Sequence, residues 1–263
     1  MLPFLTNDAY VNIILIHLMI SVRVLALLLT ASVFMVPNIP TPVRYWLSVG
    51  LALIITPAVG ASVPAITLGS LIMTLLMIAR EFLIGALLGV ISSLPLYALQ
   101  TSGFLDGTQM GLNMMNMMDP SLREQLSVLA QLKYMLAIWF YLHWDGHMLL
   151  IRALMESVRL VPVGISLWED PAAIPVMEWL QHVFVIAMRI SLPIFAAIIL
   201  GEIGLGFVAR TVPQLNVFIL GIPLKIGIGL FVLLVVLPGT VDIFYGEIEP
   251  AVTQALSSMR FLR

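Results

Sequence analysis

The chain has 263 residues, of which 61% are hydrophobic and only 10% are charged, whereas an average soluble domain carries about 25% charged residues. This composition excludes an ordinary soluble domain and predicts an integral membrane protein or a subunit of a membrane complex. A net charge of −2 without a basic cluster argues against nucleic acid as a partner, and the lack of cysteine excludes disulfides and thiolate sites.

The first predicted helix runs from about Asp8, which can serve as its N-cap, to Val36, where prolines end it. Its first residues contain no Lys or Arg and no small-residue cleavage site follows, so we expect no signal peptide. Arg23 lies in the middle of this helix. We interpret it as a buried arginine bonded to carbonyl groups or to a carboxylate.

Two further apolar segments follow, at Val43–Ile55 and at about Thr67–Ser102, and Pro95 is expected to kink the second of them. Residues of this second segment recur at four-residue intervals, which places them on one ridge of a helix; they are Glu81, Gly85, Gly89 and Ser93. Small residues on such a ridge let another backbone approach closely. That backbone belongs either to this chain or to a neighbouring subunit, and the sequence leaves both open.

Gly103–Arg123 is the best loop candidate, because it combines three glycines with two Asn, two Asp and a Pro. Five of the 16 methionines lie within nine of its residues; they are Met110, Met114, Met115, Met117 and Met118. The methionine side chain adapts to irregular and changing surfaces. The residues alone favour methionines that fill gaps at a helix end, with a seal that yields to passing polypeptide as the alternative.

Ser121–Leu142 is predicted to be a helix that begins with a capping box of Ser121 and Glu124 and carries Lys133 as its single interior charge. The following HWDGH sequence places two His and one Asp within five residues, but Gly146 interrupts the helix, so we predict no metal site. The sequence contains no nucleophile elbow, phosphate-binding loop or dinucleotide turn, and we predict neither a catalytic site nor a cofactor.

The most apolar part of the chain is predicted to form a helical hairpin, with helices at Pro175–Arg210 and Val217–Ile243 joined by a polar tip. It carries five polar or charged residues: Glu202, Arg210, Gln214, Asn216 and Lys225. Because a charge in lipid costs roughly 2.5–3.5 kcal/mol, such residues usually face protein or water. An ordinary transmembrane hairpin with a solvated turn is the alternative. The more charged tail, Tyr245–Arg263, is expected to lie at a surface.

The segment ARTVPQLNVFILGIPLKIGIGL resembles the C-terminal signature of the FliR family, the export-gate subunits of flagellar type III secretion. It also resembles FliQ, a small helical hairpin with a proline and a lysine after its turn, here Pro223 and Lys225. The resemblance extends to REFLIGALLGV at Arg80–Val90 and to Asp106–Pro120, and covers most of the chain. The injectisome proteins of the SctT/YscT/SpaR group are related to this family, so flagellar use rests on resemblance alone.

The resemblance implies an all-α membrane protein in which a FliP-like part, residues 1–172, is fused to a FliQ-like hairpin, residues 173–247, followed by a tail at 248–263. It implies a place in the flagellar basal body at the bacterial inner membrane. There the chain would join FliP and FliQ relatives, with FlhB-type and FlhA-type export proteins, in a closed channel for unfolded flagellar proteins. Its buried charges would contact the neighbouring subunits.

In the FliR family the loop that corresponds to about 103–123 projects into the channel as a plug. The resemblance therefore implies a plug made of these residues: Gly111, Met114, Met115, Met117, Met118, Asp119 and Pro120.

A self-contained secondary transporter is the alternative function, with a midplane substrate site formed by Arg23, Glu81, Glu202 and Lys225. That class of protein requires inverted repeats, and the sequence shows no convincing internal symmetry.

Overall fold

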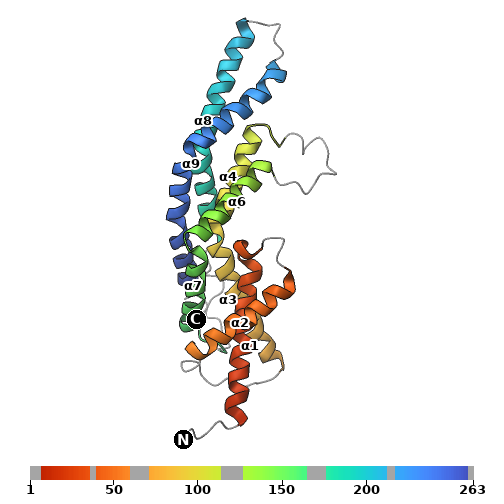
Figure 1. Ribbon diagram of the computed structural model, residues 1–263, viewed down its shortest axis with the longest axis vertical. Coiled ribbons are helices and arrows are strands. Elements are labelled where there is room, and N and C mark those ends of the chain that lie inside the picture. Colours follow the sequence, from red (N-terminus) through yellow and green to blue (C-terminus); the bar gives the residue numbers. More distant parts are fainter. Residues whose placement is uncertain are drawn as a thin grey trace. The chain divides into compact units, whose positions relative to one another are not determined.

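The computed structural model describes residues 7–35, 40–59, 71–113, 127–164, 176–211 and 217–259 (Figure 1). Within these ranges all regular structure is helical, as predicted. The described helices are α1 (Asn7–Thr30), α2 (Thr41–Val59), α3 (Leu71–Ser92), α4 (Leu94–Gln109), α6 (Val128–His143), α7 (Gly146–Leu160), α8 (Val176–Thr211) and α9 (Val217–Ser258), with a short 3₁₀ helix at Ser32–Phe34.

Four of the described helices are long and apolar enough to cross a membrane. The candidate spans are Asn12–Thr30, Leu71–Ser92, Val176–Thr211 and Leu220–Ser258. A span needs about 20 predominantly apolar residues, and α8 and α9 exceed this length with 36 and 42 residues. The prediction of an all-α membrane protein is therefore confirmed.

The chain divides into two compact units, each built from segments that lie far apart in the sequence. Unit 1 consists of Met1–Leu94, Asp145–Val176 and Ile248–Arg263. Unit 2 consists of Pro95–Trp144 and Met177–Glu247. The charged residues described below therefore belong to two separate packing environments.

In unit 1, α1 packs against both α2 and α3. The glycines of α3 explain the close approach of α1, because a Cβ on Gly85 would lie 2.0 Å from the carbonyl oxygen of Arg23. A Cβ on Gly89 would lie 2.2 Å from Thr30 Oγ1. One turn further on, Ser93 Oγ accepts a hydrogen bond of 2.8 Å from the backbone N–H of Ser32. The ridge predicted from the four-residue spacing thus faces α1 of the same chain.

The predicted helix Thr67–Ser102 and the predicted loop that follows it need correction. The helical segment is interrupted at Ser93, and Pro95 lies in the first turn of α4, where its missing N–H removes no helical hydrogen bond. α4 then continues to Gln109, so the first part of the predicted loop is helical. Gly103, within α4, allows close packing of α6 and does not form a turn, because a Cβ at this position would lie 2.7 Å from Ala130 Cα in α6.

The start of α6 also differs from the prediction. The helix begins at Val128, after Ser127 with an extended backbone (φ −43°, ψ 128°), and so does not run unbroken from Ser121. The predicted capping box of Ser121 and Glu124 lies outside the described residues.

Within the predicted surface tail, α9 continues as a helix to Ser258, and Tyr245 and Glu249 are exposed on it. The side chains of Ile248, Ala251, Val252 and Ala255 are buried in unit 1. Their spacing of i, i+3, i+4 and i+7 is that of the apolar stripe of an amphipathic helix. The glutamates of the tail obscured this periodicity, although Glu249 lies on the exposed side of the same helix.

In unit 2, α8 and α9 form the predicted hairpin, side by side along much of their length (Figure 1). One buried cluster joins the hairpin to α4 and α6, and it consists of Met110, Leu129, Ile194 and Ile198. Partly buried residues of the loop after α4 and of α9 pack around it; they are Leu112, Ile226, Val232 and Leu233.

Candidate functional site

The first polar site is a buried ion pair in unit 1. Arg23 is completely buried, and its Nη2 lies 2.6 Å from Glu81 Oε2, while its Nε donates to the same oxygen at 2.7 Å. The guanidinium also donates to Ser157 Oγ at 3.3 Å and to the carbonyl oxygen of Val161 at 3.0 Å. A planar fork of five N–H donors suits such a convergence of oxygens. Arg23 is thus the buried, carboxylate-bonded arginine that its position in an apolar helix predicted.

This geometry shows what covers the two charges. Glu81 is 1% exposed, so arginine and glutamate neutralise each other inside the chain. Neither charge needs a neighbouring subunit to leave the lipid. Their joint role is to fix α1 against α3 and against the C-terminal end of α7.

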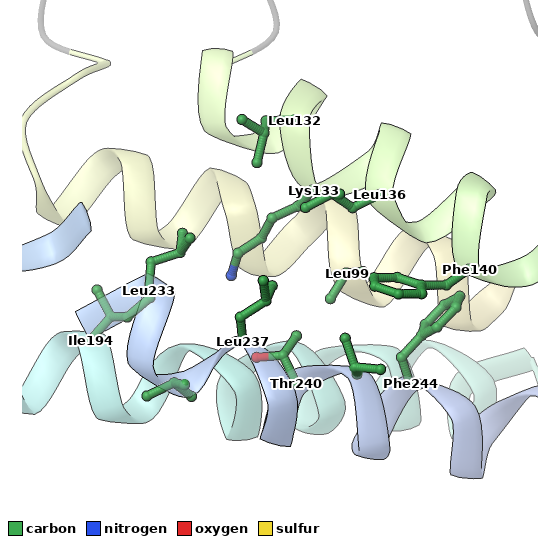
Figure 2. A pocket seen from close by; sticks show the side chains of 12 residues that line it. Leu99, Leu132, Lys133, Leu136, Phe140, Ile194, Leu233, Leu237, Thr240 and Phe244 are labelled. Atoms are coloured by element: carbon green, nitrogen blue, oxygen red, sulfur yellow. The ribbon is translucent and has the colours of Figure 1, made fainter. Parts of the chain in front are cut away.

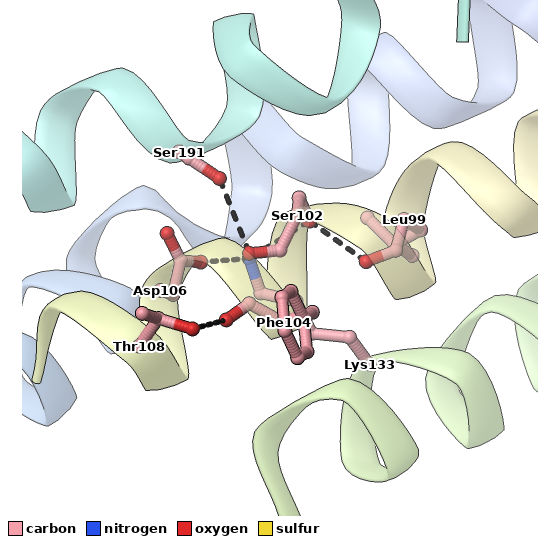
Figure 3. A network of polar contacts seen from close by, with 7 residues as sticks. All are labelled: Leu99, Ser102, Phe104, Asp106, Thr108, Lys133 and Ser191. Atoms are coloured by element: carbon pink, nitrogen blue, oxygen red, sulfur yellow. Dashed lines mark hydrogen bonds and ion pairs between the residues drawn. The ribbon is translucent and has the colours of Figure 1, made fainter. Parts of the chain in front are cut away.

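The second polar site is an ion pair in unit 2 that the predictions did not include (Figure 3). Lys133 of α6 contacts Asp106 Oδ2 of α4, and it donates to Ser102 Oγ at 3.1 Å. Ser191 Oγ of α8 donates to the backbone carbonyl of Ser102 at 3.2 Å. Three helices of unit 2 thus meet at one charged centre, in which Asp106 is fully buried.

Burial governs the ionisation of this pair. Removal from water raises the pKa of the Asp106 carboxyl, which the positive charge of Lys133 opposes. The same loss of water lowers the pKa of Lys133, against the effect of the carboxylate. Burial likewise raises the pKa of the Tyr141 hydroxyl in α6. Each charge of the pair therefore depends on the other to remain ionised.

A small pocket lies beside Lys133 (Figure 2). Its volume of about 20 Å³ admits about one water molecule. Leu99, Phe140, Leu237 and Phe244 are among its apolar lining residues, and Leu99 and Leu237 lie nearer to the lysine side chain than the two phenylalanine rings do (Figure 2).

Both members of the missed pair carry a signal in the sequence. Lys133 is the only charge in the apolar stretch of its helix, and Asp106 is the only acid between Glu81 and the methionine-rich segment. One cation and one acid, each isolated on one of two consecutive apolar helices, predict an ion pair between these helices. The acid was missed because Gly103 and Gly107 made its surroundings resemble a loop.

The hairpin charges lie in a different environment. Lys225 contacts Glu202 across the hairpin, with side chains 30% and 43% exposed, so each is the other's partner within unit 2. Arg210 is exposed near the end of α8. Gln214 and Asn216 lie outside the described residues.

Of the predicted plug residues, Gly111 lies in the part of the chain that the structure describes. Gly111 is described, and Met114, Met115, Met117, Met118, Asp119 and Pro120 lie outside the described residues. Gly111 has φ 82° and ends α4, since its N–H bonds to the carbonyl of Thr108 at 3.1 Å and the N–H of Leu112 bonds to that of Gly107 at 2.9 Å. This pair of hydrogen bonds is a Schellman cap, whose left-handed position favours glycine. Gly111 is therefore a helix terminator at the base of the methionine-rich segment.

The HWDGH sequence forms the turn between α6 and α7. Asp145 adopts a left-handed conformation (φ 55°), and His143 stacks on Trp139 with ring centroids 5.3 Å apart. Trp144 packs edge-on against Tyr245 at 4.9 Å. Among the described residues no group of three metal-ligating side chains exists. The turn is an aromatic cluster.

These features define an all-helical membrane protein whose ion pairs fasten its own helices together and whose apolar hairpin leaves much of its surface uncovered. The sequence profile of the family described as "Bacterial export proteins, family 1" matches residues 14–251. The chain therefore belongs to this family of bacterial export proteins.

The relatives include flagellar biosynthetic proteins and a Yop proteins translocation protein. The chain is 30% identical to the flagellar biosynthetic protein FliR of Escherichia coli K12, with 82% of each chain covered. It is 31% identical to FliR of Bacillus subtilis 168 over 83% of this chain and 84% of the relative. It is also 30% identical to the Yop proteins translocation protein T of Yersinia pestis over 70% of this chain and 71% of the relative.

Proposed function

We propose that this chain is a structural subunit of the export gate of flagellar type III secretion, located in the bacterial inner membrane at the basal body. It assembles with FliP and FliQ relatives, and with FlhA-type and FlhB-type proteins, into a closed channel for unfolded flagellar proteins. Its role is architectural and not catalytic. The observation that carries the proposal is the family match over residues 14–251, together with FliR relatives that align over four fifths of both chains.

The surface of the hairpin supports a partner of similar structure. Only 11% of the apolar window in the Leu220–Ser258 span is buried. Large side chains stand exposed on both helices of the hairpin, including Leu200, Phe207, Phe231, Leu234 and Val235. Lipid could cover such an apolar surface as well as protein could. In the proposed gate, however, residues 1–172 form the FliP-like part, and residues 173–247 form a FliQ-like hairpin that packs beside FliQ itself.

Co-expression with FliP and FliQ relatives tests this assembly. We expect the three proteins to purify as one large complex in mild detergent, and this chain alone to aggregate because the hairpin remains uncovered. The measurement is size-exclusion chromatography with mass determination. A stable, monodisperse lone protein that transports a small solute would contradict the proposal and favour the secondary transporter.

The proposed plug comprises Gly111–Pro120, with its methionines as the sealing surface. We expect deletion of Met114–Met118 to leave the complex assembled but leaky to ions, because flexible thioether side chains close an irregular opening well. The measurement is the conductance of the purified complex in planar bilayers. Substitution of all four methionines in this stretch by leucine is the matched control, and it should leak less than the deletion. Equal conductance of deleted and intact complexes would exclude the seal.

A further inference from the structure

Met110 is the last described methionine before the proposed plug, and it is held unusually firmly. Its side chain is fully buried although it directly precedes the Gly111 cap. It lies in the cluster with Leu129 of α6 and with Ile194 and Ile198 of α8, and partly buried residues of α9 pack against that cluster. Met110 therefore fixes the point at which the chain leaves α4.

The place that receives Met110 is a notch in α9 made by Gly229. A Cβ on Gly229 would lie 2.3 Å from Met110 Cε, 2.7 Å from Cγ and 2.8 Å from Sδ. All three distances are far inside van der Waals contact. The neighbouring Gly227 differs, because a Cβ there would meet nothing within 4 Å. Of these two glycines in the same helix, only Gly229 is needed for space.

The residues that follow the proposed plug in the sequence, 127–129, pack close to Met110 as well. Leu129 of α6 belongs to the Met110 cluster, and Ser127 Oγ would lie 2.4 Å from a Cβ on Gly107 in α4. Just before the segment begins, Asn113 Nδ2 donates to Thr108 Oγ1 at 2.8 Å and to the carbonyl oxygen of Phe104 at 3.3 Å. Residues 110–113 and 127–129, here called the stem, are thus anchored on α4 and on the hairpin.

We propose that Met110, seated in the Gly229 notch, is the positioning residue that ties the stem to α9 and so sets where the sealing segment is held. This inference rests on the proposed function of Gly111–Pro120 as a plug. It assigns a role in the seal to Gly229, a residue of the hairpin more than 100 positions away in the sequence. A displacement of α9 at Gly229 would move the stem with it.

The test measures the stem directly in the assembled complex with FliP and FliQ relatives. Leu112→Cys supplies the only cysteine of this chain, and its reaction with a maleimide reports whether the stem is seated. A methyl group on Gly229 would overlap the Met110 side chain, which must then shift from its present position. We expect labelling about tenfold faster than with Gly227→Ala, where a Cβ meets nothing within 4 Å. Met110→Ala should also speed labelling, and the double variant should label no faster than the faster single variant, because both changes remove the same contact.

The same complexes are then compared in planar bilayers. Gly229→Ala should raise the conductance, and Gly227→Ala should not. Equal labelling rates of Gly229→Ala and Gly227→Ala would overturn the inference. It would also be overturned if Gly229→Ala labelled faster without raising the conductance, provided that deletion of Met114–Met118 does raise it. A complex that stays tight after that deletion counts against the plug, and the labelling rates still decide the Met110–Gly229 contact.

Discussion

Replacement of Arg23 by methionine is expected to destabilise the protein by about 3–5 kcal/mol, because it leaves a buried carboxylate without its cation. Glu81 is 1% exposed and receives two of the four short contacts of the guanidinium. The loss is measured as the fall in the thermal midpoint of the gate complex in detergent. The double variant Arg23→Met/Glu81→Leu should recover most of it, since a buried pair replaced by apolar residues of similar volume is often nearly neutral.

Arg159→Met provides the control for this prediction. Arg159 pairs with Glu156 at 3.4 Å, but the two side chains are 65% and 46% exposed. Exposed pairs contribute about 0–1 kcal/mol, so the midpoint should barely change. A midpoint for Arg23→Met equal to that of Arg159→Met would show that the buried pair does not hold unit 1 together.

Replacement of Lys133 by methionine is expected to make stability depend on pH in a defined direction. Without the lysine, the effect of burial on Asp106 is opposed only by its hydrogen bond with Ser191, so its folded-state pKa rises further above the value of about 3.9 in the unfolded chain. The folded state then binds the proton more tightly than the unfolded state does. The variant should be most stable below about pH 4 and lose stability as the pH rises toward the folded-state pKa. At pH 7 the cost should reach about 3–5 kcal/mol.

Unfolding of the variant between pH 4 and pH 7, with the wild type at each pH as reference, measures this dependence. The second substitution Asp106→Asn removes the titrating group and should flatten the difference. Lys225→Met is the matched control, since its partner Glu202 is 43% exposed and so is not enclosed by this chain as Asp106 is. If stability of Lys133→Met rises with pH relative to the wild type, Asp106 is not the buried, proton-binding group that the structure indicates.

Much of the fold follows from the sequence because lipid restricts the choices. In an apolar chain, backbone groups must be satisfied within helices. The first helix and the hairpin were recognisable from apolar length and prolines alone, although α1 ends at Thr30 and not at Val36, and α9 continues beyond Ile243 to Ser258. The position of Arg23 in the middle of an apolar helix also determines its state, because an unpaired charge there is too costly.

The predictions that the structure corrected concern residues whose structural role depends on what they pack against in the folded chain. Gly103 and Gly107 look like loop residues, yet they admit Ala130 and Ser127 at close range. The glutamates near Ile248 suggested a solvated tail, yet the apolar stripe behind them is buried. Glycine serves a turn and a close helix contact equally well, so composition alone cannot separate the two. The Asp106–Lys133 pair was lost through the same ambiguity.

The Arg23–Glu81 pair has a consequence for synthesis at the ribosome. The two residues are 58 positions apart, and Ser157, which also binds the guanidinium, comes 134 positions after Arg23. At about 5–20 residues per second, Arg23 is synthesised roughly 3–12 s before its partner Glu81. During this interval the arginine must be kept hydrated at the insertion machinery or at the membrane surface. Stable integration of the first helix therefore waits for the third, and a nascent chain cut before Glu81 should remain extractable from the membrane.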